Sequence, residues 1–340
     1  MARIKDVAEL AGVNRSTVSR IINGEGKFKE ETRRKVEQAM AQLNYRPSAI
    51  ARSLATSSSN MMGLLVTYYT GGFFGEMMEQ VQTELDMHHK FLITAQGHHS
   101  AQGEREAIQR FHDLRCDGYV LHSRYLSDDD LRALAQQPTP FVLLDRYVAG
   151  LEERCITFDH RGASQIVVEH LIQQGHRKIA CITGPLHRHN SRLRQQGYLD
   201  ALAQAGILPS KSLCEEGNYG RKSGYFAMQQ LFARHPEITA VFSCSEEMTT
   251  GALQYLHEQG IAVPGRISIV SFDSVDLCES LYPTVTAVHF PISEMARAAV
   301  QSLIAMVKQQ PTVGPQSFRP ILKRRHADQP LSKIAERQDS

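Results

Sequence analysis

Residues 4–24 read IKDVAELAGVNRSTVSRIING, in which two short segments with helical apolar spacing flank Gly12-Val13-Asn14. Gly12 can take the positive φ of a sharp corner between helices, and Asn14 is a suitable N-cap for the helix that follows. Each segment carries one apolar stripe that would face inward: Val7, Ala8 and Ala11 in the first, Val18, Ile21 and Ile22 in the second. The stretch therefore predicts two helices joined by a tight turn.

This pattern matches a helix-turn-helix, in which the second helix enters the major groove of DNA. Arg15, Ser16 and Arg20 lie away from the apolar stripe, so their side chains are free to reach base edges or phosphates. Two ordinary surface helices at the start of a larger domain would give the same spacing, because small helix pairs are common. The spacing alone leaves both interpretations open.

The distribution of charge along the chain favours DNA binding. Residues 1–59 hold eleven Lys and Arg against six Asp and Glu, a net charge of +5, whereas the remaining 27 basic and 30 acidic residues give −3. A basic head on a body of opposite charge is typical of proteins that bind nucleic acid through one domain. Because charge runs also occur on ordinary solvated faces, this distribution supports the helix-turn-helix without proving it.

A third helix is predicted over residues 30–44, where Val36, Ala39, Met40 and Leu43 recur at helical spacing. Pro47 then disfavours helix at Arg46, and Ser48 can cap a short segment at residues 49–55. Seven residues make about two turns, too few to be stable alone in water. We expect a hinge helix that forms only against DNA or a second copy, followed by a polar linker; a plain linker throughout is the alternative.

From residue 62 onward, apolar runs typical of strands alternate with helical stretches. The predicted strands are 63–66, 91–94, 118–121, 141–144, 156–158, 178–183, 240–243, 267–272 and 287–290, and the predicted helices include 75–89, 101–115, 162–174, 192–205, 248–259 and 292–308. This alternation indicates parallel sheets covered on both faces, and its length fits two doubly wound lobes with a ligand cleft between them. We predict an all-α headpiece at 1–46, a hinge and linker at 47–60, an α/β two-lobed effector-binding and dimerisation domain at 61–326 and a polar tail at 327–340.

Several classes of protein are not expected. The chain has no run of about 18 apolar residues, and its charged N-terminus lacks the apolar core of a signal peptide, so we expect a cytoplasmic protein without a membrane span. The six cysteines are scattered singly and are predicted to be reduced and mostly buried. Neighbouring histidines at 88–89, 98–99 and 187–189 lack the spacing of zinc sites, and no nucleotide-binding or nucleophile motif occurs. We therefore predict no metal, no cofactor and no enzyme.

Six stretches carry a resemblance to a known family: IKDVAELAGVNRSTVSRIING, TRRKVEQAMAQLNYRPSAIARSLA, HLIQQGHRKIACITGP, RQQGYLDALAQAGI, GALQYLHEQGIAVPGRISIVSFD and LKRRH. They resemble the lactose-repressor/galactose-repressor (LacI/GalR) family of bacterial transcription regulators and run to about residue 326. ERCITFD, HLIQQGH and FRPILKRRH are closest to the galactose-repressor branch. The resemblance implies a periplasmic-binding-protein-like body behind the headpiece.

The resemblance also implies a homodimer on pseudo-palindromic operator DNA. Arg15, Ser16 and Arg20 occupy the base-reading positions of the family, and Arg20 suits a bidentate contact with guanine. The positions that contact or support the DNA backbone are occupied by Asn23, Thr32 and Tyr45. Leu54 matches the hinge leucine that enters the minor groove, where unstacking a base step bends the DNA.

In the body, Phe73-Phe74, Arg194 and Asp273 match positions that line the effector cleft of the family. A guanidinium and a carboxylate can clamp sugar hydroxyls, and an aromatic ring can stack on the apolar face of a sugar. Asp145 and Asp159 are weaker candidates, because an aspartate at a strand end is more often a loop cap. The chain departs from the family pattern at Tyr68, Gly71-Gly72, Ser245-Glu246 and Ser274, so galactose specificity is not carried over.

The predicted function is a dimeric, operator-binding transcription regulator, a repressor of carbohydrate-utilisation genes, whose cleft binds a sugar-like effector. Tyr68 and Ser245 are kept as candidate effector contacts. Release of DNA by the ligand is favoured over corepression, because sugar regulators of this family usually work that way. The alternatives are a solute-binding protein of transport, which would need an export signal and no headpiece, and a sugar-converting enzyme, which would need a catalytic constellation.

Overall fold

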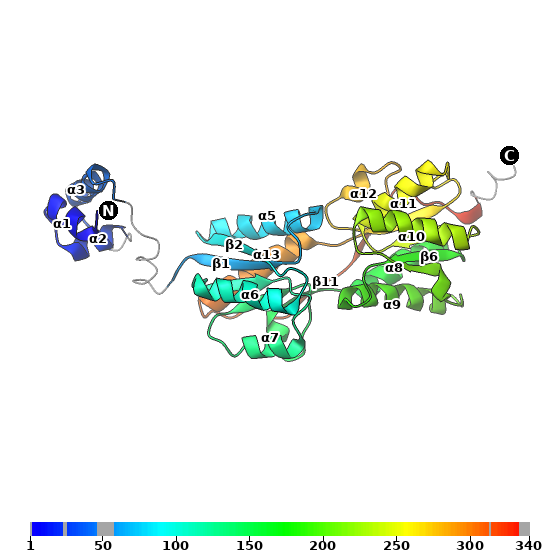
Figure 1. Cartoon of the computed structure of the whole chain (residues 1–340), viewed down its shortest axis with the longest axis horizontal. Helices are drawn as coiled ribbons and strands as arrows, with labels where there is room; N and C mark the ends of the chain where they lie inside the picture. The colour runs from blue at the N-terminus through cyan, green and yellow to red at the C-terminus, as the bar shows by residue number, and fades with distance from the viewer. Residues whose placement is uncertain (1, 23–25, 46–57, 313, 333–340) are drawn as a thin grey trace.

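The structure is a computed structural model of the 340-residue chain, and it describes residues 2–22, 26–45, 58–312 and 314–332. Figure 1 shows a group of short helices at the N-terminal end and, beyond them, two lobes built of helices and strands. The predicted hinge helix at residues 49–55, with Leu54, lies outside the described residues, and so does Asn23. Their predicted contacts with DNA stay predictions.

The headpiece consists of α1 (Ile4–Ala11), α2 (Arg15–Ile22) and α3 (Glu30–Gln42). The first two have eight residues each, too few to be stable alone, so their packing must stabilise them. The packing is a small core of Val7, Ala8, Ala11, Val18, Val36 and Ala39, with Ile21 and Ile22 partly buried against it. The predicted apolar stripes are thereby confirmed.

The corner between α1 and α2 forms as the sequence predicts. Gly12 takes a left-handed conformation with φ 65°, and its N–H points to the carbonyls of Ala8 and Glu9 at the end of α1. The carbonyl of Asn14 accepts the N–H groups of Thr17 and Val18, which begins α2. Helix α3 ends earlier than the predicted residue 44, because Asn44 has φ 45°, a value outside the right-handed helix.

The first lobe is a six-stranded parallel sheet in the order β11-β5-β4-β3-β1-β2. Its strands are β1 (Met61–Val66), β2 (Phe91–Gln96), β3 (Gly118–Leu121), β4 (Phe141–Leu144), β5 (Cys155–Phe158) and β11 (Gln316–Phe318). Its helices are α5 (Gly72–Met87), α6 (Ala101–Asp113), α7 (Asp128–Leu134) and α13 (Ile292–Val307). Helix α13 packs against α5 and against β3 and β4, whereas α6 packs against β1 and β2.

The second lobe repeats this plan in the order β12-β10-β9-β8-β6-β7. Its strands are β6 (Ile179–Thr183), β7 (Cys214–Glu216), β8 (Ala240–Ser243), β9 (Ser268–Asp273), β10 (Thr286–His289) and β12 (Ile321–Lys323). Its helices are α8 (His160–Gln173), α9 (His189–Gln204), α10 (Arg221–Arg234), α11 (Glu246–Glu258) and the short α12 (Leu277–Ser280). Helix α8 packs against α9, and α10 packs against α11. The two doubly wound lobes confirm the predicted fold class.

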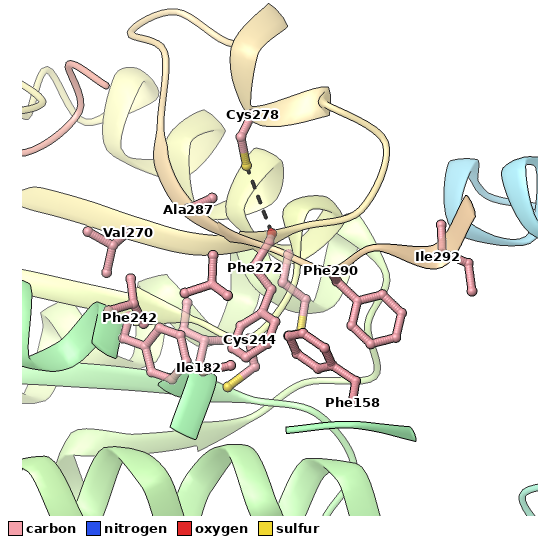
Figure 2. Packing of buried hydrophobic residues seen from close by; sticks show 14 of the residues in the cluster. Phe158, Ile182, Phe242, Cys244, Val270, Phe272, Cys278, Ala287, Phe290 and Ile292 are labelled. Carbon is pink, nitrogen blue, oxygen red and sulfur yellow. Dashed lines mark hydrogen bonds between the residues drawn. The ribbon is translucent and has the colours of Figure 1, made fainter. Parts of the chain in front are cut away.

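The chain passes between the lobes three times within its described part: after β5, between β10 and α13, and between β11 and β12. The first two passages lie beside an aromatic cluster, which Figure 2 shows with the surrounding core of the second lobe. The ring centres of Phe158 and Phe290 are 4.7 Å apart, and Phe272 lies next to them. Because only three short segments join the lobes, they form a natural hinge.

The structure differs from the predicted pattern at several short elements. Strands β7, β11 and β12 and helices α7, α10 and α12 were not predicted, and β12 runs antiparallel to β10, so the second sheet is not purely parallel. Each of these three strands has only three residues, which is too short for a period-2 pattern to be read. They form because distant strands offer them backbone partners.

The second lobe also extends beyond the predicted end of the body at residue 326. Ala327 is fully buried, and the N–H of Leu331 donates to the carbonyl of Gln174 at 2.9 Å. His176 Nε2 lies 3.1 Å from the carbonyl oxygen of Gln329. The described residues 327–332 therefore belong to the lobe, which their polar composition did not indicate.

The cysteines and the helices can be compared with what the sequence predicts for thiols and membrane spans. All six cysteines are free, and Cys214 alone among them is only partly buried. The expectation of unpaired, mostly buried thiols agrees with this. No helix in the described part of the chain combines the length and the apolar character that crossing a bilayer requires.

Candidate functional site

The exposed face of α2 carries the three predicted base-reading side chains. Arg15, Ser16 and Arg20 are exposed, whereas Val18 on the opposite face is fully buried. The guanidinium of Arg20 lies 5.4 Å from the centre of the Phe28 ring, a cation–π contact, and the residue as a whole is exposed. Within the described headpiece, ion pairs join Lys5 to Glu9 and Lys35 to Glu31, so neither arginine of α2 has a carboxylate partner there.

The predicted backbone-contacting residues lie at the edge of the headpiece core. Thr32 is half-buried in the first turn of α3. Tyr45 packs against the core of the headpiece, and its N–H donates to the carbonyl of Met40 at 2.9 Å. A ring held in this way can present its hydroxyl to a phosphate, which would position the headpiece without reading sequence.

A cavity of about 520 Å³ lies between the two lobes of the body. Its walls are formed by loops that follow the carboxyl ends of β1, β3, β4, β6, β7, β8 and β9. Doubly wound sheets bind ligands in this crevice, and the volume falls within the range of small-molecule sites. The predicted residues that line it are Tyr68, Phe73, Phe74, Asp145, Arg194 and Ser245.

Aromatic rings form the apolar part of the cavity wall. The ring centre of Phe73 lies 5.0 Å from that of Phe74 and 5.5 Å from that of Phe290. Because Phe290 lies in the passage between β10 and α13, this second contact connects the first lobe to the hinge. Phe272 contributes a further ring from the second lobe. Such faces can stack on the C–H surface of a sugar or on an aryl group.

Tyr219 is a cavity residue that the sequence did not reveal. It can approach the end of β6 because Gly184 has no side chain: a Cβ there would lie 2.2 Å from the tyrosine ring. Tyr219 has φ 69°, an uncommon value for a bulky residue, and its hydroxyl lies 2.7 Å from Ser191 Oγ. Strained residues of this kind cluster at functional sites. Tyr219 was missed because it follows the unpredicted strand β7.

Arg194 is held rigidly at the base of the cavity. Its side chain is 93% buried, its Nε donates to His160 Nδ1 at 3.2 Å, and its Nη1 donates to the carbonyl of Cys244. The guanidinium carbon lies 3.9 Å from the centre of the Phe272 ring. These hydrogen bonds use the N–H of Nε and one N–H of Nη1, so the other N–H groups of the guanidinium are left as donors for a ligand, as the predicted role of Arg194 requires.

Asp145 joins the lobes through a buried charge network. Its carboxylate accepts hydrogen bonds from Arg124 of the first lobe and from His160 Nε2 of the second, the latter at 2.8 Å. Burial alone would raise the pKa of Asp145, but the interaction with His160 and the charge of Arg124 hold it well below its usual range. Asp145 is therefore ionised and occupied by protein partners, so its main effect is to fix the arginine and the histidine.

The hydrogen bonds determine the tautomers of two buried histidines. Since Arg194 can only donate to His160 Nδ1, the proton of His160 must be on Nε2, which donates to Asp145. In the same way, Arg124 donates to His122 Nε2 at 2.7 Å, so His122 Nδ1 carries the proton and donates to Thr67 Oγ1 at 3.0 Å. Burial and nearby guanidinium groups lower the pKa of both rings.

The depressed histidine pKa values predict a pH dependence of stability. In the unfolded chain a histidine titrates near pH 6.5, so below that pH the unfolded state binds more protons than the folded state. We expect the free energy of unfolding to fall with decreasing pH from about 6.5, by up to about 1.4 kcal/mol per pH unit for each ring. Urea unfolding of the full chain between pH 5 and pH 7.5 measures this slope.

A matched pair of variants assigns the effect. In His160→Gln the amide nitrogen can still donate to Asp145, so the fold should survive. The slope of the unfolding free energy against pH should decrease by about 1.4 kcal/mol per pH unit, which is the contribution of one proton. His257→Gln changes an exposed side chain on α11 and should leave the slope unchanged. An unaltered slope in His160→Gln would show that His160 does not titrate with folding.

Asp273 is not brought to the cavity wall formed by the described residues, contrary to the expectation from the resemblance. Side chains alternate along a strand, so Phe272 and Ser274 face the cavity while Asp273 between them faces away. Its carboxylate lies 3.5 Å from the guanidinium of Arg325, and burial raises its pKa. Asp273 as an effector contact is therefore not supported by the geometry.

A buried carboxylate that does line the cavity is that of Glu246. Ser274 Oγ donates to Glu246 Oε1, and burial raises the pKa of Glu246 above its usual value. Glu247 next to it is half-exposed at the wall and can accept a hydroxyl from a ligand. The two departures at Ser274 and Glu246 thus form one hydrogen-bonded pair.

Two other candidates serve as helix caps. The side chain of Ser245 accepts the N–H of Met248 at the start of α11, although the residue also lines the cavity. Asp159 accepts the N–H of Gly162 at the start of α8 and lies outside the cavity wall as described. For Asp159 the loop-cap interpretation is therefore the better one.

Four further residues line the cavity without having been predicted: His122, Arg124, Arg188 and Asn190. His122 directly follows β3, Arg124 and Arg188 lie in the loops after β3 and β6, and Asn190 lies in the first turn of α9. The rule that doubly wound sheets bind ligands at the carboxyl ends of their strands would have selected them. Together, the basic headpiece and the two-lobed cavity define a ligand-responsive DNA-binding regulator.

The chain is similar to known regulators over nearly its whole length. Residues 3–48 match the family described as bacterial regulatory proteins, lacI family, and residues 168–327 match the periplasmic binding protein-like domain. The chain is 38% identical over 328 residues to the HTH-type transcriptional regulator GalR of Escherichia coli (strain K12), covering 96% of each chain. It is 32% identical to the ribose operon repressor of the same organism, covering 96% of this chain and 99% of that one.

A solved structure agrees with these similarities. The Lac repressor dimer bound to operator and the anti-inducer ONPF has a TM-score of 0.87 and 27% identity, covering 96% of this chain and 99% of that one. The chain therefore belongs to the LacI family of bacterial regulatory proteins and is a DNA-binding transcription regulator. The predicted family, fold and DNA-binding function are confirmed, and the similarity to GalR agrees with the galactose-repressor branch.

Proposed function

We propose that the chain is a homodimeric repressor of carbohydrate-utilisation genes whose affinity for operator DNA is controlled by a sugar-like ligand. The observation that carries this proposal is the inter-lobe cavity of about 520 Å³, lined by aromatic rings and guanidinium donors, in a chain with a DNA-binding headpiece. The relatives support it, since one is named for the ribose operon and another is a dimer on its operator. Its site of action would be the bacterial cytoplasm, where operator DNA is found.

The ligand would act by changing the closure of the two lobes. It contacts Tyr68 and Phe73 on one side and Arg194 on the other, so its binding energy depends on the separation of the walls. A ligand shifts the equilibrium only if it binds the DNA-competent and DNA-incompetent closures with different affinity. We propose that it favours the incompetent closure and so releases the operator.

The test is a screen of sugars and sugar derivatives on the full chain bound to DNA from upstream of its own gene. Fluorescence anisotropy of the labelled DNA reports operator affinity, and calorimetry on the free protein reports ligand binding. We expect at least one sugar derivative to bind and to lower operator affinity. If compounds bind the protein but none changes operator affinity, the proposed control is wrong.

We propose that the junction between the body and the headpiece transmits lobe movement. Asp117, directly before β3, accepts hydrogen bonds from Ser58 Oγ at 2.6 Å and from the N–H groups of Ser59 and Asn60 at 2.8 and 3.1 Å. It also pairs with Lys90 at 2.8 Å, where both side chains are nearly buried. Residues 58–60 are therefore fixed to the amino ends of the first sheet, opposite the cavity.

Replacing this carboxylate should separate ligand binding from its effect on DNA. Asp117→Asn keeps one acceptor oxygen but loses the ion pair, so we expect a stability loss of about 1–3 kcal/mol. Ligand affinity should stay within about twofold, while the ligand-induced change in operator affinity should decrease at least fivefold. Asp113→Asn, an exposed change on α6, is the control. A normal ligand response in Asp117→Asn would show that the junction does not transmit closure.

A further inference from the structure

A second cavity of about 310 Å³ adjoins the first one on the side of the α9 N-terminus. The two cavities share Arg124, Asp145, Arg188 and Asn190, so these residues form the wall between them. The rest of its lining holds the polar residues Ser123, Asp128, Arg146, Thr157, His160, His187, His189 and Arg192 together with Tyr147, Phe158 and Leu193. It therefore offers many donors, and its lining has a larger polar share than that of the first cavity.

The charges of this second cavity are not balanced. Its lining holds four guanidinium groups and two carboxylates. Arg124 pairs with Asp145, and Arg146 pairs with Asp128 at 2.7 Å, which uses both acids. Arg188 and Arg192 have no carboxylate partner among the described residues.

The two unpaired arginines are held in place by neutral partners. Arg192 Nη1 donates to the carbonyls of Leu186 and His187 at 2.9 and 2.8 Å, which leaves its other nitrogens open. Arg188 Nη2 donates to the Tyr68 hydroxyl at 3.2 Å, and its Nε is buried without any acceptor. An unsatisfied buried donor on the wall between two cavities indicates a site that lacks an acceptor.

The start of α9 adds further donors to the same cavity. Arg188 is the N-cap residue of this 16-residue helix and supplies no side-chain cap, while His189 and Asn190 in its first turn line the cavity. The N–H groups of a first helical turn and the positive end of the helix dipole favour an anion. Burial, together with Arg192 and Arg146, lowers the pKa of His189, as expected in positive surroundings.

We propose that the second cavity binds the anionic group of an effector whose ring occupies the first cavity, so that the effector is a phosphorylated or acidic sugar. Arg188, on the shared wall, would contact both parts of the ligand, and Arg192 would contact the anionic group alone. This inference rests on the proposed function, since it names the chemical class of the ligand for that site. It also gives a reason for the altered polar groups of the first cavity. A neutral hexose would obtain its binding energy from such groups, whereas an anionic ligand obtains part of it from the contacts of its anionic group.

The test measures binding to the full chain by calorimetry, with inorganic phosphate, neutral hexoses and the 6-phosphates of the same hexoses as probes. Inorganic phosphate should bind at one site per chain, and at least one hexose phosphate should bind tenfold or more tightly than its parent sugar. Arg192→Gln should weaken phosphate and hexose phosphate at least tenfold and a neutral hexose less than twofold. The preference for the phosphate should decrease as ionic strength rises.

The matched control is Arg177→Gln. Arg177 is also exposed, and its Nη1 also donates to two backbone carbonyls, of Ile172 and His176, but it lies at the amino end of β6, away from both cavities. It should leave every affinity unchanged. Sulfate at equal concentration tests whether the cavity selects tetrahedral anions in general.

Three results would overturn the inference: no phosphate binding to the wild-type chain, equal affinity for every hexose and its phosphate, or equal weakening by Arg192→Gln and Arg177→Gln. The first two leave the proposed function intact if a neutral sugar binds and releases the operator. Conversely, a hexose phosphate could bind through Arg192 without changing operator affinity. That result would confirm the proposed ligand class and contradict the proposed control of DNA binding by the ligand.

Discussion

The variant Arg20→Ala is expected to lose specific operator binding by about 2–6 kcal/mol in the dimer, because two base contacts worth about 1–3 kcal/mol each are removed. Arg20 is exposed on α2, opposite the buried Val18, and its described contact is with the face of the Phe28 ring. The substitution should therefore leave the headpiece folded. Fluorescence anisotropy with operator DNA and with scrambled DNA of equal length, at one salt concentration, measures the loss.

Discrimination between the two DNAs decides the role of Arg20. Non-specific affinity should decrease only slightly, since one charge of the basic headpiece is removed. Arg34→Ala, an exposed change on α3, is the control and should lower both affinities by the same small factor. If Arg20→Ala also lowers both equally, Arg20 contacts phosphate and does not read bases.

The second large effect is expected at the cavity, where Arg194→Met should abolish the response to ligand while operator binding persists. Methionine keeps part of the packing on Phe272, but it removes the hydrogen-bond donor to the ligand. The Cys244 carbonyl and His160 Nδ1 also lose the hydrogen bonds that they accept from Arg194. Charge-assisted hydrogen bonds contribute about 1.5–3 kcal/mol each, so ligand affinity should decrease at least tenfold. The ligand concentration that half-releases the operator measures this change.

The control for this variant is Arg161→Met. Arg161 is exposed at the start of α8 and pairs with Asp200, so its loss should leave the ligand response intact. Thermal unfolding of both variants separates a folding defect from a binding defect. A normal release midpoint in folded Arg194→Met would exclude Arg194 as a ligand contact.

The headpiece could be predicted closely because its information is local. Gly12 ends one helix, Asn14 begins the next, and the apolar spacing on either side shows which faces are buried. Each of these signals lies within a few residues of the feature that it determines. The same holds for the longer strands and helices of the body, whose apolar runs exceed one period of the pattern.

The cavity could be predicted only in part, because its walls come from loops far apart in the sequence. Phe73, Arg194 and Ser245 were found through the resemblance, and the structure places them around one space. Arg188 and Tyr219 were not found, because nothing in their local sequence shows which space their loops enter. Only the order of strands in the two sheets brings these loops together.

By itself, the sequence determined that the protein has a helix-turn-helix head, two doubly wound lobes and the family to which it belongs. The tertiary structure alone decided which charged groups face the ligand space. Strand alternation turns Asp273 toward Arg325 and Ser274 toward Glu246, and the packing of the two lobes commits Asp145 to Arg124 and His160. The physical reason is that burial makes an unpaired charge costly, so these acids depend on partners that only the fold brings near, and those partners are 15 to 52 residues away in the sequence.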